Sequence, residues 1–200
     1  MLELRGLARL NVGPIDLVVG AGECLAITGP SGAGKSLLLR MVADLDPHDG
    51  DCLLDGRSCA GMPATAWRAQ VRYLPAESGW WRETVAEHFP SGTDFAAGLP
   101  ALGLPAEAAR WPVARLSTGE RQRLALLRAI GPGVRVLLLD EPTSGLDAGN
   151  VAAVESLLAA QCAAGVALLL VTHDEAQAAR LATRRLRLAG GRLATTEGAA

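Results

Sequence analysis

The chain has 200 residues, half of them hydrophobic, so it suits one compact domain with a sizeable core. Its 19 basic and 21 acidic residues nearly cancel to a formal net charge of −2, which excludes a global basic field for nucleic acid or an anionic membrane surface. No apolar run approaches the ~20 residues that span a bilayer, and charges interrupt the N-terminus MLELRGLARL too often for a signal peptide. We therefore expect no nucleic-acid partner, and we expect any membrane part of the function to belong to another chain.

Hydrophobic periodicity predicts most of the secondary structure. In chain order it indicates strands at 2–7, 15–19 and 23–28, a helix at 35–45, a strand between turns at 49–58 and a strand at 71–75. A stretch from about 78 to 114 is rich in Pro, Gly and Trp and carries short helical pieces. Beyond it we expect a capped helix at 116–130, an apolar strand at 134–140, a helix at 151–165, a strand at 166–173, a helix at 174–182 and a hairpin at 184–196. Apolar strands that alternate with helices predict an α/β fold with a parallel sheet covered on both faces.

The four cysteines are spread along the chain, at Cys24, Cys52, Cys59 and Cys162. Their spacing forms no CxxC pair and no Cys/His cluster. We expect four reduced, partly buried thiols of a cytosolic protein and no metal site among them.

The stretch GPSGAGKS, Gly29 to Ser36, holds the only lysine of the chain and fits the pattern GxxxxGK[ST]. Its glycines allow backbone N–H groups to curl around a phosphate, and the following helix points its positive end at the anion. Lysine is a compact charge on a long stem, whereas the broad fork of arginine would not fit the same loop. The alternative is a flexible turn with a solvated lysine, but the strand before the loop and the helix after it favour phosphate binding. The residues expected to bind nucleotide here are Gly29, Pro30, Ser31, Gly32, Ala33, Gly34, Lys35, Ser36 and Leu37.

A second element of the same chemistry is VLLLDE, in which an apolar strand ends at Asp140 and Glu141. Asp140 and the Ser36 hydroxyl are candidate ligands of Mg²⁺, and Glu141 is a candidate for polarising the attacking water. The alternative for this pair is an acidic turn that closes a buried strand. The loop upstream favours the catalytic interpretation.

With these motifs the chain resembles the ATP-binding cassette (ABC) ATPases over essentially its whole length. Three further stretches carry the resemblance. LSTGERQR, from Leu116 to Arg123, resembles the family signature LSGGQ with Thr118 and Glu120 as variants; EPTSGLD, ending at Asp147, matches the D-loop; and His173 takes the place of the switch histidine. The resemblance implies that Lys35, Glu141 and His173 are catalytic. It also implies that Ser117, Gly119 and Glu120 bind the ATP held by the opposite subunit of a dimer. Simpler alternatives are a helix cap at Ser117 and at Asp147 and a packed strand-end residue at His173.

The resemblance implies a P-loop NTPase fold with a RecA-like parallel sheet, a small N-terminal antiparallel β part and an inserted helical subdomain at about 78–128, all within one domain, 1–200. It implies ATP and Mg²⁺ as cofactors and ATP hydrolysis that powers an ABC transporter. The partners would be a second ATPase subunit, identical or homologous, and an integral-membrane permease on a separate chain. The protein would then be cytoplasmic and peripheral on the inner face of the cell membrane. The alternative from another class is a non-transport ABC ATPase that acts as a nucleotide-dependent switch, or a regulator with weak catalysis.

Two departures from the family pattern stand out. Ala76, followed by Glu77, replaces the glutamine that the family places after the strand at 71–75, where it touches Mg²⁺. No aromatic residue before Trp67 can stack on adenine, so we expect Arg9, Leu10 or Val12 to cover the base with weak selectivity. The other aromatic rings concentrate in the expected insert, where they form either a partner-binding groove or a small core: Trp80, Trp81, Phe89, Phe95 and Trp111.

Overall fold

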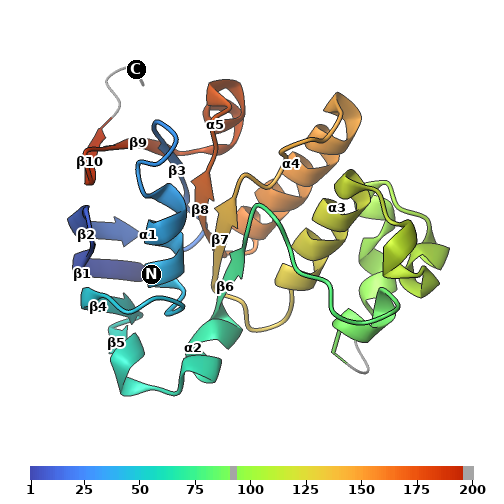
Figure 1. Cartoon of the computed structure of the whole chain (residues 1–200), viewed down its shortest axis with the longest axis horizontal. Helices are drawn as coiled ribbons and strands as arrows, with labels where there is room; N and C mark the ends of the chain where they lie inside the picture. The colour runs from blue at the N-terminus through green and yellow to red at the C-terminus, as the bar shows by residue number, and fades with distance from the viewer. Residues whose placement is uncertain (91–93, 196–200) are drawn as a thin grey trace.

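A six-stranded sheet in the order β10-β9-β3-β8-β7-β6 forms the centre of the structure (Figure 1), a computed structural model that describes residues 1–90 and 94–195. The strands β6, β7, β8, β3 and β9 pair in parallel, and β10 pairs antiparallel with β9. Their bounds are β3 (Cys24–Thr28), β6 (Val71–Leu74), β7 (Val136–Asp140), β8 (Ala167–Val171), β9 (Arg184–Ala189) and β10 (Arg192–Thr195). The predicted parallel sheet is thus confirmed, and so is the C-terminal hairpin up to Thr195, although its expected end at Thr196 lies outside the described residues.

The two faces of this sheet pack against different helices, because side chains along a strand alternate between faces. Val136 and Leu138 of β7 belong to a core shared with α1 (Lys35–Val42). Leu137 and Leu139 belong to a second core shared with α3 (Thr118–Ala129) and α4 (Ala148–Ala163). In Figure 1, α1 accordingly lies on one side of β7 and β8, and α3 and α4 lie on the other.

A small antiparallel sheet in the order β2-β1-β4-β5 packs beside α1, as the sequence predicts. Its strands are β1 (Leu2–Arg9), β2 (Val12–Val19), β4 (Asp49–Leu54) and β5 (Arg57–Ser58). Leu2, Leu4 and Leu7 of β1 point into the α1-side core and are almost fully buried. This sheet therefore covers the side of the molecule on which the Gly-rich loop lies.

The segment between β6 and α3 folds into a series of short 3₁₀ turns, which match the short helical pieces that its sequence predicts. They are η2 (Ala86–His88), η3 (Phe95–Gly98), η4 (Pro100–Leu102), η5 (Ala106–Arg110) and η6 (Val113–Arg115). Leu99, Leu102 and Ala108 of this segment are buried and join the core that includes α3 and α4. Residues 91–93 of the expected insert lie outside the described residues, and its bounds of about 78–128 stay a prediction.

Some elements were not predicted from the sequence, namely α2 (Ala64–Gln70) and the short η1 (Cys59–Gly61) that precedes it. The sequence of α2, ATAWRAQ, has one large apolar side chain and therefore no clear periodicity. That side chain, Trp67, is fully buried, and its Nε1 donates to the carbonyl oxygen of Val42 at 2.9 Å. This side chain therefore anchors α2 to the end of α1. The short α5 (Glu175–Leu181) completes the fold. Within the described ranges, every helix is too short or too polar to span a membrane.

We predict that Trp67→Ala lowers the free energy of unfolding by about 3–5 kcal/mol, because it removes a buried ring and leaves the Val42 carbonyl without its donor. Urea denaturation followed by circular dichroism measures this loss. Trp81→Ala is the matched control: its ring is 68% exposed, and its loss should stay below about 1 kcal/mol. Equal losses in the two variants would contradict an anchoring role for Trp67.

Candidate active site

The Gly-rich loop joins β3 to α1 and has a backbone that few residues other than glycine adopt. Gly29, Gly32 and Gly34 have φ of 143°, 76° and 95°. A Cβ at Gly34 would lie 2.2 Å from Val12 Cγ2, and one at Gly29 would lie 2.2 Å from the Leu188 carbonyl oxygen. Glycine at these two positions therefore allows both the loop's curl and its close packing.

The N-terminus of α1 opens directly onto this loop. Gly34 is the N-cap residue, and no side chain among the described residues caps the helix there. The first N–H groups of α1 are thus available to an anion, and the helix dipole favours one. Lys35 Nζ lies over the same loop and donates to the carbonyl oxygens of Gly29 and Pro30 at 2.8 and 2.9 Å. The single lysine is therefore held at the place where a phosphate would meet these N–H groups.

Asp140 ends β7 on the face that carries Val136 and Leu138, which is the α1 face. It is only 4% exposed, and its Oδ2 accepts a hydrogen bond from the Tyr73 hydroxyl at 3.1 Å. Burial, together with the Asp140 carboxylate, raises the pKa of Tyr73, so its hydroxyl remains a donor at neutral pH. Tyr73 holds one carboxylate oxygen in place and was not identified as a site residue from the sequence.

Glu141 and His173 form a direct pair at the ends of neighbouring strands. His173 Nδ1 lies 2.8 Å from Glu141 Oε2, and the His173 backbone N–H donates to the same oxygen at 3.4 Å. Glu141 has a φ of 50°, a left-handed conformation that costs a residue with a side chain about 1–3 kcal/mol. This turn brings the carboxylate toward His173. Because the Glu141 carboxylate accepts, His173 donates through Nδ1. Its Nε2 is then left for another partner, and the side chain is 75% exposed.

The residues predicted from the signature lie at the start of α3. Ser117 is the N-cap residue and forms a complete capping box with Glu120: the Ser117 Oγ accepts from the Glu120 N–H at 3.2 Å, and Glu120 Oε2 accepts from the Ser117 N–H at 2.8 Å. The predicted capping interpretation is thus correct for these residues. Because α3 and α1 cover opposite faces of the sheet, Ser117 and Gly119 are separated from the Gly-rich loop of the same chain. Asp147 likewise caps α4 through the Asn150 N–H at 3.0 Å.

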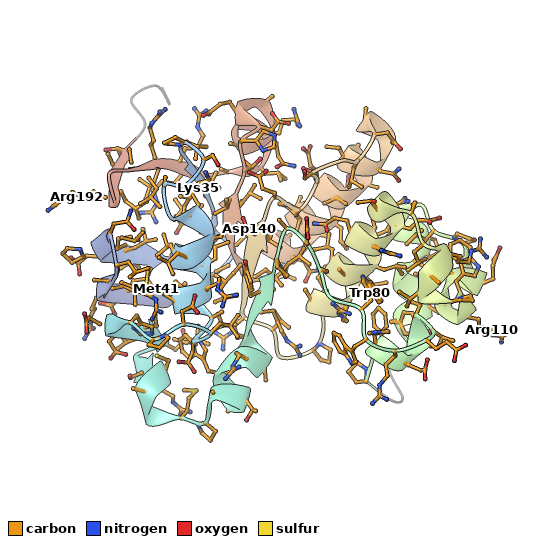
Figure 2. All side chains as sticks on the ribbon, in the orientation of Figure 1. Lys35, Met41, Trp80, Arg110, Asp140 and Arg192 are labelled. Atoms are coloured by element: carbon orange, nitrogen blue, oxygen red, sulfur yellow. The ribbon has the colours of Figure 1, made fainter. Side chains whose placement is uncertain are left out.

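The arrangement brings a Gly-rich loop, the buried carboxylate of Asp140 and a glutamate–histidine pair to one edge of a parallel sheet, where Figure 2 labels Lys35 and Asp140. A family model described as ABC transporter matches residues 12–144. The chain belongs to the ABC transporter family.

Several relatives within the family resemble most of this chain. An aliphatic sulfonates import ATP-binding protein SsuB from Cupriavidus necator is 40% identical over 190 residues, or 92% of this chain and 62% of the relative. One from Ralstonia nicotianae is 41% identical and covers 90% of this chain and 64% of the relative. A probable anion import ATP-binding protein from Haloferax volcanii is 35% identical and covers 88% and 71%. The chain thus spans somewhat less than two thirds of the length of the first two relatives.

Solved structures of ABC ATPases share the fold. A bacterial Atm1-family ABC exporter with ATP bound has a TM-score of 0.85 at 26% identity, covering 96% of this chain and 37% of that chain. A dimeric ATP-binding cassette in a post-hydrolysis state, bound to ADP and Pi, also has a TM-score of 0.85; at 23% identity it supports the fold alone, over 99% of this chain and 100% of that one. The predicted fold class, a P-loop NTPase sheet with an antiparallel β part, is therefore confirmed.

The structure places the residues at which the sequence departs from the family pattern. Ala76 and Glu77 are both exposed in the turn that follows β6. Of the residues expected to cover the base, Leu10 is 86% exposed at the β1–β2 turn, whereas Val12 is buried against Gly34. Arg9 donates through Nη1 to the Pro47 carbonyl oxygen. Of these three residues, Val12 is therefore the one that packs on the Gly-rich loop.

We predict that Tyr73→Phe raises the Mg²⁺ concentration for half-maximal turnover by about 10-fold, because the carboxylate of Asp140 loses the hydroxyl that orients it. A Mg²⁺ titration of ATP hydrolysis at saturating ATP measures the shift. Thermal unfolding of the same variant should change little, since the ring and its packing remain. An unchanged Mg²⁺ requirement would show that the hydrogen bond does not act on the metal site.

Proposed function

We propose that this chain is the ATP-binding and ATP-hydrolysing subunit of an ABC transporter. The observation that carries the proposal is the meeting of the Gly-rich loop, Asp140 and the Glu141–His173 pair at one sheet edge. The loop N–H groups and Lys35 would hold the phosphates of ATP. Phosphoryl transfer needs positioning and charge stabilisation more than covalent help, and these groups supply both.

The metal-binding part of the site fits a magnesium ion. Ser36 offers a hydroxyl and Asp140 a carboxylate, and hard divalent cations prefer such oxygen ligands. One oxygen of Asp140 is already held by Tyr73, which leaves the other free to face a metal or its water. When bound, Mg²⁺ would neutralise charge on the phosphate oxygens.

Glu141 and His173 would have separate roles in hydrolysis. Glu141 would orient the attacking water, and His173, held by Glu141 through Nδ1, would contact the γ-phosphate through Nε2. Lys35 would complete the set by contacting the β/γ oxygens. We thus assign catalysis to Lys35, Glu141 and His173.

Hydrolysis would take place in a head-to-tail dimer. Within one chain the sheet lies between the Gly-rich loop and the capped start of α3, so Ser117, Gly119 and Glu120 could meet a phosphate only on another subunit. A capped helix start remains an anion site because its first N–H groups point outward. The opposite subunit is either a second copy or a homologue.

The names of the relatives favour transport, and specifically import, over the alternative of a non-transport switch. The relevant partner is an integral-membrane permease on a separate chain, which would hold the protein on the inner face of the cell membrane. The cargo would be recognised by that permease.

A groove beside β6 and α3 is the surface we assign to the permease. It has a volume of about 760 Å³ and is lined by Tyr73, Leu74, Trp81, Phe95, Arg128 and Ile130 among others. Its lining is largely apolar and aromatic, which suits the apolar face of a permease helix. The expected insert at about 78–128 supplies most of this groove and would act as the coupling subdomain.

The aromatic rings of the expected insert differ in their surroundings, which supports a core role for most of them and a partner-binding role for one. Phe89 and Phe95 stack at 3.7 Å, and together with Trp80 and Trp111 they pack against the core. Trp81 is 68% exposed, and the guanidinium of Arg128 lies 5.0 Å from its ring centroid. Most of the rings thus form the small core of the insert, and Trp81 remains for a partner.

We predict that Glu141→Gln lowers ATP turnover by about 10²–10⁴-fold while ATP binding is kept, because only the polarisation of water is lost. Phosphate release measures turnover, and size-exclusion chromatography with ATP and Mg²⁺ should reveal a trapped dimer. Glu107→Gln, an exposed change on η5, is the matched control and should leave both unchanged. Wild-type turnover in Glu141→Gln would contradict the assigned role.

We predict that tagged Glu141→Gln protein, loaded with ATP and Mg²⁺, co-purifies a polytopic membrane protein in stoichiometric amount from gently solubilised membranes. Adding Trp81→Ala should reduce this recovery at least several-fold without changing the ATP affinity of the isolated subunit, since Trp81 lies in the groove. Val18→Ala, at an exposed apolar side chain on β2, should leave recovery unchanged. A soluble dimer with no membrane partner, or with a ribosomal or DNA-associated one, would favour the switch.

A further inference from the structure

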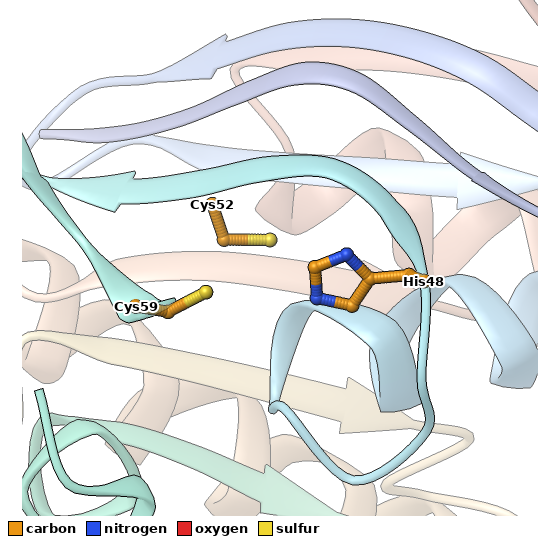
Figure 3. Close-up of side chains that lie close together, drawn as sticks. All are labelled: His48, Cys52 and Cys59. Carbon is orange, nitrogen blue, oxygen red and sulfur yellow. The ribbon is translucent and has the colours of Figure 1, made fainter. Parts of the chain in front are cut away.

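His48, Cys52 and Cys59 are brought together by the fold beside the antiparallel sheet (Figure 3). One nitrogen of His48 and the two sulfurs all lie within 4.8 Å of one another. The spacing of these residues, H-x₃-C-x₆-C, matches no familiar metal motif, so the sequence did not predict that the three side chains meet. The expectation that the cysteines hold no metal stays a prediction. The cluster has no role in the ATP chemistry proposed above.

The local fold explains why these side chains meet. Cys52 is on the inward face of β4 and is fully buried. The turn at Asp55 and Gly56, both with positive φ, folds β5 back on β4, so that Cys59 at the start of η1 returns to the level of Cys52. His48 lies in the loop that enters β4, and Figure 3 shows its ring directed toward both sulfurs.

We propose that His48, Cys52 and Cys59 form a binding site for one thiophilic metal ion of the zinc type. Tetrahedral zinc bound to two thiolates and an imidazole requires sulfur–sulfur and sulfur–nitrogen separations of about 3.5–3.8 Å. The observed span exceeds this by about 1 Å, which rotation of the side chains and a small shift of the His48 loop can supply. Three protein ligands leave the fourth position to water or to an outside ligand.

The ring of His48 is already oriented as a ligand. Its Nδ1 lies 3.3 Å from the carbonyl oxygen of Asp49, an acceptor, so the proton belongs on Nδ1. Nε2 is then the unprotonated nitrogen that can bind a metal. A second hydrogen bond of this kind is how metal-binding histidines are commonly held.

The charges around the cluster favour a cation. The carboxylates of Asp51 and Asp44 lie near both thiols and place negative charge beside the cluster. On binding, each thiol releases one proton to solvent, and the ion with two thiolates and a neutral imidazole is uncharged overall. A neutral centre suits this buried place, and thiolate ligands select zinc-type ions over Mg²⁺.

A bound ion would join three segments of the N-terminal half: the loop after α1, β4 and η1. Arg9 of β1 already holds this loop through the Pro47 carbonyl oxygen. The ion would therefore fasten the antiparallel sheet to the end of α1, the helix whose other end opens onto the Gly-rich loop. We expect the ion to stabilise the fold and not to take part in hydrolysis.

The test is a Zn²⁺ titration of the full, nucleotide-free chain, reduced and stripped of metal, in competition with a chromophoric chelator. We expect about one equivalent to bind, Co²⁺ to give a thiolate-to-metal charge-transfer band, and Zn²⁺ to raise the melting temperature. His48→Ala, at a partly exposed loop residue, and Cys59→Ala should each weaken Zn²⁺ binding by about 100-fold or more.

Two control variants locate the site. Cys162→Ala removes a thiol elsewhere, and His173→Ala removes the imidazole of the ATP site; both should bind Zn²⁺ as the wild type does. Equal Zn²⁺ affinity in wild type and His48→Ala, or a Co²⁺ complex without the thiolate band, would overturn the proposal. Loss of binding in His173→Ala instead would place the ion at the ATP site and would overturn it as well. Circular dichroism of each variant without metal confirms that it is folded.

Discussion

Parallel pairing of β3, β8 and β7 is the constraint on which the rest of the site depends. Parallel neighbours end at the same edge of a sheet, so whatever follows each strand is brought together. The Gly-rich loop follows β3, His173 lies just beyond β8, Asp140 ends β7 and Glu141 follows it. These strands are buried on both faces, which leaves little freedom for their ends to move. The sheet thus sets the positions of the site residues, and the loops set only the final orientation of each side chain.

Two local features of the backbone shape that edge of the sheet: a left-handed residue after β7 and a close contact of the Gly-rich loop. Glu141 adopts a left-handed conformation while its N–H still donates to the Val171 carbonyl oxygen at 2.9 Å, so the strand pairing continues through the strained residue. At Gly34 the loop packs so closely on Val12 that any side chain would collide. Glycine at position 34 therefore lets the loop rest directly on the β1–β2 hairpin.

The sequence predicts those parts of the molecule whose signals are local. The apolar strands, the Gly-rich loop and the capped start of α3 can each be recognised within about ten residues, because periodicity and capping act over that range. The features that were missed depend on partners far apart in the chain. Tyr73 meets Asp140 across 67 residues, and α2 is held by the contact of Trp67 with Val42 across 25. The approach of His48 to Cys59 depends on the turn at Asp55, and the spacing of the three residues in the sequence does not reveal that turn.

Tyr73 would connect the two functional surfaces that we propose, in a chain where Ala76 replaces the family's glutamine. Its hydroxyl donates to Asp140, the proposed Mg²⁺ ligand, and Tyr73 also lines the groove that we propose for the permease. β6 is an edge strand of four residues, and its neighbours Arg72, Leu74 and Pro75 line the same groove. A partner that moves β6 would thus change the orientation of the Asp140 carboxylate through one hydrogen bond. Ordering of the metal site and docking of a partner would then favour each other, since any such coupling is reciprocal.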